Sequence, residues 1–548
     1  MGLPLRKILY IAWFAFIVAF AAFRCMHLNA DFPNHTVWSG DWAKYTDEGW
    51  YSNAAVRSHL LGQWYLKGDF NPAVAVPVWP FFEWVLFFFT GVSLVAARGL
   101  AVAGFFLQLL LSYLLVRTSV PRWAAMLALT FMVTSPFLYC FSRLAVLEPF
   151  LMVFTLMALN LAVRLHRLRG PRLGAVVVGL LFAVMMLTKT YALFLLPALA
   201  WATFVPLRGR RRLAIECLLA EGCAFAAVYG FWLALIAGNG FFGDYRLFFF
   251  INNYPRPHEF YWPLVAFWWS IHGGLWADTI LMPLSGIIVL TAIIAAAITW
   301  RTSSSRLREN LGTLARRLLL DPVFGSAIVA GAGTIVFMTY QNHPQPRYFA
   351  VTAVFCFIVV AIGATALFEL ALVAAASQRK LFKGAGVAVV AVSLVAVAAN
   401  SMQTVTYVIH PEFTFVKAAE HLTGYIDAHP NGRRLLVSVS GDQIMLATHL
   451  PAICDDYGTM SLPNKLAAYQ PGWYASWNDL DAGSLADLHT LYSLEQVADY
   501  PAFDDTDRNL LILFKLHPLA GGKVRDQARE NLRIKLPGDK FNVEVDEE

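Results

Sequence analysis

The chain has 548 residues, of which 58% are hydrophobic and 14% are charged, and its mean hydropathy is +0.55. This composition excludes a soluble globular protein and predicts a polytopic membrane protein. The net charge of +6 does not indicate a nucleic-acid partner, because the basic residues are dispersed among the loops between apolar runs. The six cysteines form no C-x-x-C pair and no Cys/His cluster, so neither a structural zinc site nor a disulfide framework is signalled.

The first apolar run, 8–23, follows Arg6 and Lys7 directly. No small-residue cleavage site comes after it, so we expect an uncleaved first helix rather than a signal peptide. Eleven runs are long enough to cross a bilayer: 8–23, 99–116, 123–140, 147–163, 173–188, 190–206, 213–237, 280–300, 323–340, 348–374 and 385–402. Two more, 78–97 and 263–277, are ambiguous.

The basic residues decide how 78–97 lies. They cluster in five loops, at 117–122, 164–172, 208–212, 301–317 and 379–383. If 78–97 does not cross, every cluster falls on the same side as the N-terminus, as the positive-inside rule requires. This also keeps Glu83 out of the hydrocarbon, where an unpaired carboxylate costs roughly 3 kcal/mol.

We therefore expect 78–97 to be a helix on the outer leaflet, started by Pro77 and Pro80. The tryptophan-rich run 263–277 has the composition of a second interfacial segment. An extra pair of spanning helices is the alternative.

The resulting fold class is a polytopic α-helical membrane protein with about eleven transmembrane helices. The transmembrane domain covers 1–402, its first exterior loop is 24–98, and the C-terminal domain covers 403–548. That domain carries twelve Lys or Arg against twenty-one Asp or Glu. Strand-like runs at 434–440 and 509–515 and a helical pattern at 412–428 predict a small α/β unit.

Two adjacent carboxylates, Asp47 and Glu48, stand in the first exterior loop. A carboxylate at the membrane surface can take a proton from an acceptor hydroxyl. The alternative is structural: Thr46 would be an N-cap, and acidic residues are favourable in the first turn of a helix.

Three isolated basic residues, Arg143, Lys189 and Arg347, are expected at the same outer boundary. Guanidinium and ammonium groups there suit a lipid phosphate, although each could instead snorkel to lipid head groups. Weaker candidates for substrate binding accompany them, namely His343, Tyr348, Glu148 and Tyr51.

These residues, in this order, resemble the GT-C superfamily of membrane glycosyltransferases. The pattern is similar to family-39/83-type enzymes, which include protein O-mannosyltransferases and the lipid A aminoarabinose transferase. The matching elements cover most of the membrane part: Asp47-Glu48-Gly49, 62–69 followed by the helix at Pro77, 91–98, Ser142-Arg143 to Glu148-Pro149, Lys189, and Pro346-Arg347-Tyr348. The chain departs from the family where Pro77-Val78-Trp79-Pro80 replaces a Pro-Pro pair, and the WWDYG motif of oligosaccharyltransferases is absent.

The resemblance implies an inverting transfer of a sugar from a polyprenyl-phosphate donor to an acceptor hydroxyl. Asp47 would match the catalytic carboxylate and Glu48 would assist it, while Arg143, Lys189 and Arg347 would bind the lipid phosphate. No metal-ligand set is evident among the exterior carboxylates, so we expect no cofactor and leave divalent-metal dependence open.

The expected partners are the polyprenyl-phosphate-linked sugar, a glycan, lipid or protein acceptor, and the bilayer. We expect a bacterial inner-membrane protein with a cytoplasmic N-terminus and a periplasmic C-terminal domain. Two other functions stay open at this point: a transporter or flippase for a lipid-linked substrate, and a non-catalytic cell-envelope assembly protein.

Overall fold

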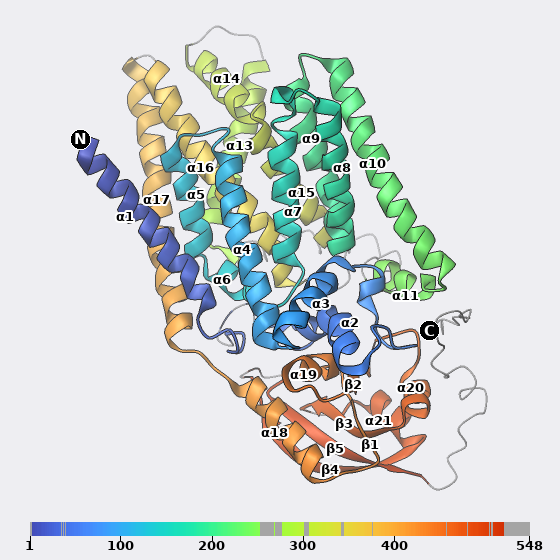
Figure 1. The fold of residues 1–548 in the computed structure, drawn as a ribbon. Helices are drawn as coiled ribbons and strands as arrows, with labels where there is room; N and C mark the ends of the chain where they lie inside the picture. Colours follow the sequence, from blue (N-terminus) through green and yellow to red (C-terminus); the bar gives the residue numbers. More distant parts are fainter. Residues whose placement is uncertain are drawn as a thin grey trace.

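The computed structural model describes residues 3–519, apart from 34–35, 37, 39, 253–267, 269–276, 301–305, 341–344, 375, 456, 479, 504 and 506–507. Most of the predicted interfacial run 263–277, the residue His343 and the acidic tail therefore lie outside the described residues. Figure 1 shows a bundle of long helices whose lower end carries a small α/β unit, while the N-terminus lies near the upper end.

The helices of the membrane part, in chain order, are α1 (Leu3–Ala22), α2 (Asp47–Leu61), α3 (Val78–Thr90), α4 (Leu94–Val116), α5 (Arg122–Thr134), α6 (Pro136–Phe141), α7 (Glu148–Ala162), α8 (Pro171–Thr188), α9 (Leu196–Leu207), α10 (Arg211–Gly238), α11 (Phe242–Arg246), α13 (Leu281–Trp300), α14 (Arg306–Leu319), α15 (Pro322–Tyr340), α16 (Phe349–Val373) and α17 (Ala376–Ile409). Short 3-10 turns occur at η1 (Phe23–Cys25), η2 (Trp42–Lys44), η3 (Pro72–Val74), η4 (Leu165–Arg167), η5 (Thr190–Leu195) and η7 (Pro346–Tyr348), and η6 (Leu247–Asn252) is a π-helix.

Nine of the eleven predicted spans correspond to helices that are long and apolar enough to cross a membrane among the described residues. The other two, 123–140 and 147–163, are shorter. The first breaks into α5 and α6, because Pro136 cannot donate a backbone hydrogen bond and Ser135 caps α6 by accepting from Leu138 N at 3.2 Å. The second is α7, with 15 residues.

The ambiguous run 78–97 forms α3, a turn at Gly91 and the start of α4. With 13 residues, α3 is too short to span about 30 Å of hydrocarbon. It packs against α2 at the end of the bundle that carries the α/β unit (Figure 1). Glu83 is fully buried on the α2 side and accepts a hydrogen bond from Ser52 Oγ at 2.7 Å. The outward face of α3 is apolar, with Phe81, Phe88 and Phe89 exposed.

The basic loops lie at the end of the bundle away from the α/β unit, where Figure 1 shows α14. Arg317 of α14 donates to the backbone oxygen of Ser119, in the loop that follows α4, at 2.7 Å. At the starts of α8 and α10, Arg172 pairs with Glu216 at 2.6 Å.

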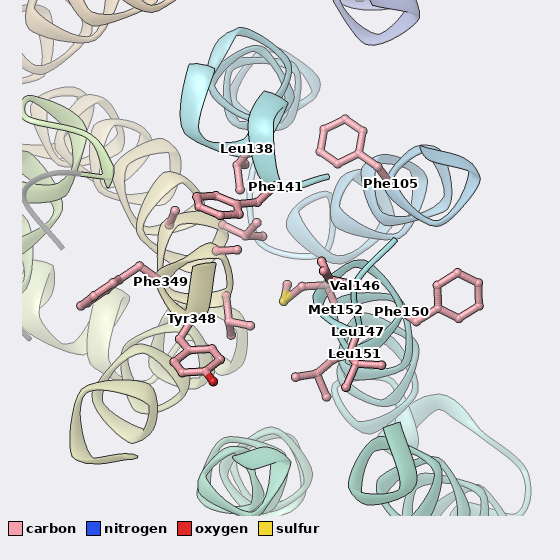
Figure 2. Close-up of a cluster of buried hydrophobic side chains, with 14 of the residues drawn as sticks. Phe105, Leu138, Phe141, Val146, Leu147, Phe150, Leu151, Met152, Tyr348 and Phe349 are labelled. Atoms are coloured by element: carbon pink, nitrogen blue, oxygen red, sulfur yellow. The ribbon is translucent and has the colours of Figure 1, made fainter. Parts of the chain in front are cut away.

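An apolar core fills the space between α6, α7 and α16. Figure 2 shows Phe141, Leu147, Leu151 and Tyr348 pointing into it, and all four are less than 10% exposed. This core brings the first residues of α7 and α16 to the same level of the bundle, which places Glu148 near Arg347.

The C-terminal unit is a five-stranded mixed sheet in the order β2-β1-β3-β5-β4. Its elements are α18 (Thr414–Ala428), β1 (Arg433–Val437), α19 (Gly441–Thr448), β2 (Ala452–Ile453), α20 (Leu462–Tyr469), β3 (Pro471–Trp477), α21 (Ala482–His489), β4 (Tyr492–Pro501) and β5 (Leu510–Pro518). β1 is parallel to β2 and β3, whereas β5 is antiparallel to β3 and β4. The predicted helix and both predicted strands are confirmed as α18, β1 and β5. The preceding helix α17 runs past residue 403 to Ile409.

The sheet unit docks on the membrane part through α19, which packs against α2. The two helices approach so closely at Gly49 that a Cβ there would lie 2.1 Å from the backbone nitrogen of Gln443. Glycine is therefore required at this position for α19 to reach α2.

Buried ion pairs reinforce the same contact. Arg57 of α2 binds Asp69 at 2.6 Å and Asp442 of α19 at 2.9 Å, and Lys465 of α20 binds Asp69 at 3.1 Å. All four side chains are 0% exposed. Because removing one partner would strand a buried charge, this cluster keeps the sheet unit and the segment between α2 and α3 in one arrangement.

We expect Gly49→Ala to destabilise the protein by about 2 kcal/mol, because the added methyl group overpacks the α2–α19 contact. The thermal midpoint of purified protein, followed by tryptophan fluorescence, measures this. The matched control is Gly99→Ala in α4, where a Cβ would meet nothing within 4 Å and alanine is the better helix former. Equal midpoints for the two variants would contradict the packing described here.

Candidate active site

The helix α2 presents its first residues to three different neighbours. Successive residues of an α-helix point about 100° apart, while residues four apart share a face. Asp47 therefore shares a face with Tyr51, Glu48 with Ser52, and Gly49 with Asn53. The adjacent carboxylates cannot point to the same place.

Asp47 points toward Arg347, with which it forms an ion pair between Oδ2 and Nη2. Its other oxygen, Oδ1, accepts from Thr46 Oγ1 at 3.1 Å. Asp47 is 2% exposed. Burial raises its pKa, and the charges of Arg347 and Lys189 oppose that rise.

Arg347 is held by a second carboxylate, Asp41. The backbone nitrogen of Arg347 donates to Asp41 Oδ2 at 2.8 Å, and Nη1 donates to Asp41 Oδ1. Asp41 also caps η2 by accepting from Ala43 N at 2.8 Å. Arg347 is thus oriented from both its backbone and its side chain, by a residue 306 positions away.

Lys189 lies between α8 and η5 and has an extended backbone conformation. Its Nζ donates to Glu148 Oε1 at 2.5 Å. Three tyrosine rings surround the ammonium group, with centroids 4.7 Å away for Tyr348, 5.5 Å for Tyr51 and 5.7 Å for Tyr191. Glu148 Oε1 also lies 3.8 Å from Arg347 Nε, so Glu148 links the two cations.

These groups form one buried cluster with three carboxylates (Asp41, Asp47 and Glu148) and two cations (Lys189 and Arg347), each at most 6% exposed. Three of its polar atoms make no hydrogen bond within the described structure: Glu148 Oε2, Arg347 Nε and the Tyr191 hydroxyl. An unpartnered buried polar group costs about 1–3 kcal/mol, and such groups call for an explanation when they gather in one place. A polar ligand or water that enters the cluster would satisfy them.

Six of the residues predicted from sequence meet in this cluster: Asp47, Lys189, Arg347, Glu148, Tyr51 and Tyr348. The cluster lies where α2, α7, α8 and α16 begin or end, beside the docked sheet unit.

Glu48 is directed elsewhere. Arg98 of α4 binds it with two hydrogen bonds, Nε to Oε1 at 2.7 Å and Nη2 to Oε2 at 2.6 Å. The backbone nitrogen of Ala145 donates to Oε1 at 2.8 Å, and Gln443 Nε2 donates to Oε2 at 3.0 Å. With four donors on its two oxygens, Glu48 joins α2, α4, the loop before α7 and α19.

Arg143 is also placed apart from Lys189 and Arg347. Its Nη1 donates to the Tyr139 hydroxyl at 2.7 Å, and its Nη2 donates to the backbone oxygens of Met26 at 2.6 Å and His27 at 2.5 Å. These contacts stabilise the segment that follows α1. Burial lowers the pKa of Arg143.

Two members of the cluster, Asp41 and Tyr191, were not among the predicted site residues. Asp41 follows Ser39-Gly40 in the sequence. Aspartate is common beside such turn-forming residues, so its position gave no signal of a role in the cluster. Tyr191 stands two residues after Lys189, and its closeness in sequence to a candidate cation could have indicated that it belongs to the cluster. Within the described residues, no three His, Cys, Asp or Glu side chains converge as a metal site would require.

The sequence matches no protein-family model, and no curated protein matches it. Solved structures do match. ArnT from Cupriavidus metallidurans in the apo state superimposes with a TM-score of 0.55 at 15% identity, over 92% of this chain and 98% of that chain. The same protein bound to undecaprenyl phosphate gives a TM-score of 0.55 at 16% identity over the same shares. The archaeal oligosaccharyltransferase AglB from Archaeoglobus fulgidus, in complex with an inhibitory peptide and a dolichol-phosphate, gives 0.48 at 12% identity, over 94% of this chain and 74% of that chain.

The expected helical membrane fold is confirmed in its coarse form. The described residues form long apolar helices and a small mixed α/β unit on the C-terminal side, and their fold is similar to that of ArnT. At this level of identity the likeness extends to the fold alone.

We expect Arg98→Met to destabilise the protein by about 3–5 kcal/mol, because it leaves the buried carboxylate of Glu48 without its cation. The control is Arg172→Met, which removes an ion pair whose arginine is 67% exposed and should change the thermal midpoint little. If Arg98→Met and Arg172→Met have the same thermal midpoint, the burial of Glu48 does not depend on Arg98.

Proposed function

We propose that the protein is an inverting glycosyltransferase that moves a sugar from a polyprenyl-phosphate donor to an acceptor hydroxyl at the extracytoplasmic membrane face. The observation that carries this proposal is the contact of a buried carboxylate, Asp47, with a paired cation site, Arg347 and Lys189, at one end of a GT-C-type bundle. Such a site contains both a base for the acceptor and positive charge for the leaving phosphate.

The proposed orientation rests on the distribution of basic residues. The basic loops lie at the end of the bundle opposite the cluster (Figure 1), and the positive-inside rule assigns that end to the cytoplasm. The N-terminus would then be cytoplasmic and the sheet unit periplasmic, as in a bacterial inner membrane. In this arrangement the shorter α5–α6 and α7 also cross, and with the nine long helices they make eleven crossings. The start of α7 lies at the same end as Lys189, because Glu148 there binds Lys189.

The donor phosphate would bind Arg347 and Lys189. One of the ArnT structures that this fold resembles is bound to undecaprenyl phosphate, which supports a polyprenyl phosphate as the ligand class. The cluster has one carboxylate more than it has cations, so an incoming phosphate must displace a carboxylate from its cation. Glu148 is the candidate for displacement, because one of its oxygens contacts both cations and the other has no hydrogen-bond partner in the described structure.

The reaction would be a single displacement. The carboxylate of Asp47 takes the proton of the acceptor hydroxyl while the hydroxyl oxygen forms its bond to the anomeric carbon. The bond between that carbon and the phosphate oxygen breaks, and the electron pair leaves with the polyprenyl phosphate. Arg347 and Lys189 stabilise the negative charge that develops there. One displacement inverts the anomeric configuration.

The two adjacent carboxylates take separate roles in this proposal. Asp47 is the base, and its burial strengthens it for that task. Glu48, whose oxygens are occupied by four donors, holds the first turn of α2 in place. Arg143 lies outside the cluster and supports the segment after α1.

The clustering of these charges at one end favours an enzyme over a transporter. Secondary transporters place their substrate and ion sites near the bilayer midplane, between internal repeats. Here the five charged side chains (Asp41, Asp47, Glu148, Lys189 and Arg347) meet at the bundle end where the sheet unit docks.

We expect Asp47→Asn to lower turnover by at least about 100-fold, the usual range for loss of a general base. Purified protein in liposomes would receive a panel of labelled undecaprenyl-phosphate sugars, with release of undecaprenyl phosphate as the measurement. Asp481→Asn, which alters an exposed helix cap in α21, is the control and should retain wild-type turnover. Equal rates for wild type and Asp47→Asn would remove Asp47 from the mechanism.

We expect kcat/KM to fall as the pH is lowered through the pKa of Asp47, since the ionised carboxylate alone accepts a proton. Burial raises that pKa above its ordinary value of 3.8, so the midpoint of the acid limb should lie above 3.8. The pH profile of undecaprenyl phosphate release tests this, with fluorescence confirming that the protein stays folded. If the residual activity of Asp47→Asn still falls at the same acidic pH as the activity of wild type, the titrating group is not Asp47.

A further inference from the structure

The first turn of α2 has no cap from its own sequence. The first backbone N–H groups of any helix lack partners within the helix, and a side chain at the N-cap usually accepts from one of them. Thr46 occupies the N-cap of α2, but its side chain makes no capping hydrogen bond. Its single hydroxyl proton is shared instead between two acceptors, the backbone oxygen of Trp42 at 3.2 Å and Asp47 Oδ1 at 3.1 Å.

Gln443 of α19 supplies the missing acceptor. Its Oε1 accepts from the backbone nitrogen of Gly49 at 2.6 Å, across 394 residues of sequence. Gly49 is the third residue of α2, the position that an N-cap side chain would normally reach. The cap of the helix that carries Asp47 therefore comes from the C-terminal sheet unit.

The other end of the same amide holds the neighbouring side chain. Gln443 Nε2 donates to Glu48 Oε2 at 3.0 Å. Gln443 is 0% exposed, so water does not compete for either bond. One side chain thus holds the backbone of Gly49 and the carboxylate of Glu48, the two residues that follow Asp47.

The position of Gln443 is itself tightly determined. The preceding residue, Asp442, accepts from Asn53 Nδ2 at 3.0 Å and binds Arg57 at 2.9 Å. The missing side chain at Gly49 lets the backbone of α19 lie against α2. The amide of Gln443 is therefore anchored on a segment that has little freedom to move relative to α2.

We infer that Gln443 is a positioning residue for the transfer reaction, and that the C-terminal unit is part of the active-site scaffold. This inference rests on the proposed function of Asp47. Arg347 and Lys189 have Asp41 and Glu148 as partners that lie outside α2. The first turn of α2 is held by Gln443 and, through Glu48, by Arg98. Loss of Gln443 should therefore misplace the base and leave the phosphate site intact.

The test compares Gln443→Met with wild type. Methionine has a similar length but can neither cap Gly49 nor bind Glu48. We expect faster amide hydrogen exchange in peptides that cover 46–53, and a fall in kcat of about tenfold or more, since small displacements in an active site cost up to about 100-fold. KM for the undecaprenyl-phosphate sugar should stay within about twofold, because the groups proposed to bind the phosphate are unchanged.

Two further variants make the result specific. Gln443→Glu keeps an acceptor for Gly49 but places a second carboxyl against Glu48. Because two adjacent buried carboxyls share one proton, the protonated variant keeps both contacts, so its exchange should resemble wild type and its kcat should lie between wild type and Gln443→Met. Asp427→Asn breaks an exposed ion pair with Arg434 in the same unit and should change neither quantity. If Gln443→Met is too unstable to purify, Gln443→Glu against Asp427→Asn still tests the split between kcat and KM.

The outcomes are distinguishable. Unchanged exchange in Gln443→Met would show that Gln443 does not cap α2, and faster exchange with unchanged kcat would show that the cap does not position Asp47; either result overturns the inference. A parallel rise in KM would indicate general loss of structure and would also overturn it. A wild-type protein that turns over no donor would contradict the proposed function and the positioning role with it, while the exchange data would still report the cap.

Discussion

The angle of about 100° between successive residues of an α-helix governs how this site is built. Asp47, Glu48 and Gly49 are consecutive, so they face three different parts of the molecule. Asp47 faces the cations that follow α8 and precede α16, Glu48 faces Arg98 of α4, and Gly49 faces α19. A single turn of α2 therefore joins the membrane bundle and the C-terminal unit.

Burial of charge is the second constraint. Each cation in the cluster is held by a carboxylate: Lys189 by Glu148, and Arg347 by Asp41 and Asp47. Buried ions need such partners, since an unpaired charge in a low-dielectric interior is costly. In the proposed function, binding of an anionic donor would exchange one of these ion pairs for phosphate contacts.

Much of this arrangement was predictable from the sequence, because it depends on patterns with a physical period or a sign. Hydrophobic run lengths located the spans, and the distribution of basic residues predicted that 78–97 stays at the surface, in agreement with the short helix α3. Isolated cations at the same predicted boundary indicated Lys189 and Arg347. The break between α5 and α6 was missed, although Ser135-Pro136 signals it.

What the sequence could not predict are contacts between residues far apart in the chain. Asp41 reaches Arg347 across 306 residues, and Gln443 reaches Gly49 across 394. Neither residue belongs to a recognisable motif. Glu48 was grouped with Asp47 because they are neighbours in sequence, and Arg143 with Lys189 and Arg347 because it lies at the same predicted boundary. Their hydrogen bonds direct both side chains elsewhere.

An experimental structure of the protein with undecaprenyl phosphate bound, determined in lipid nanodiscs, would show whether Lys189 and Arg347 hold the donor phosphate. We expect phosphate oxygens within hydrogen-bond distance of Lys189 Nζ and of a guanidinium nitrogen of Arg347, with Glu148 moved away from Lys189 and Asp47 facing the sugar position. A phosphate bound at Arg143, with the Lys189–Glu148 pair intact, would contradict it.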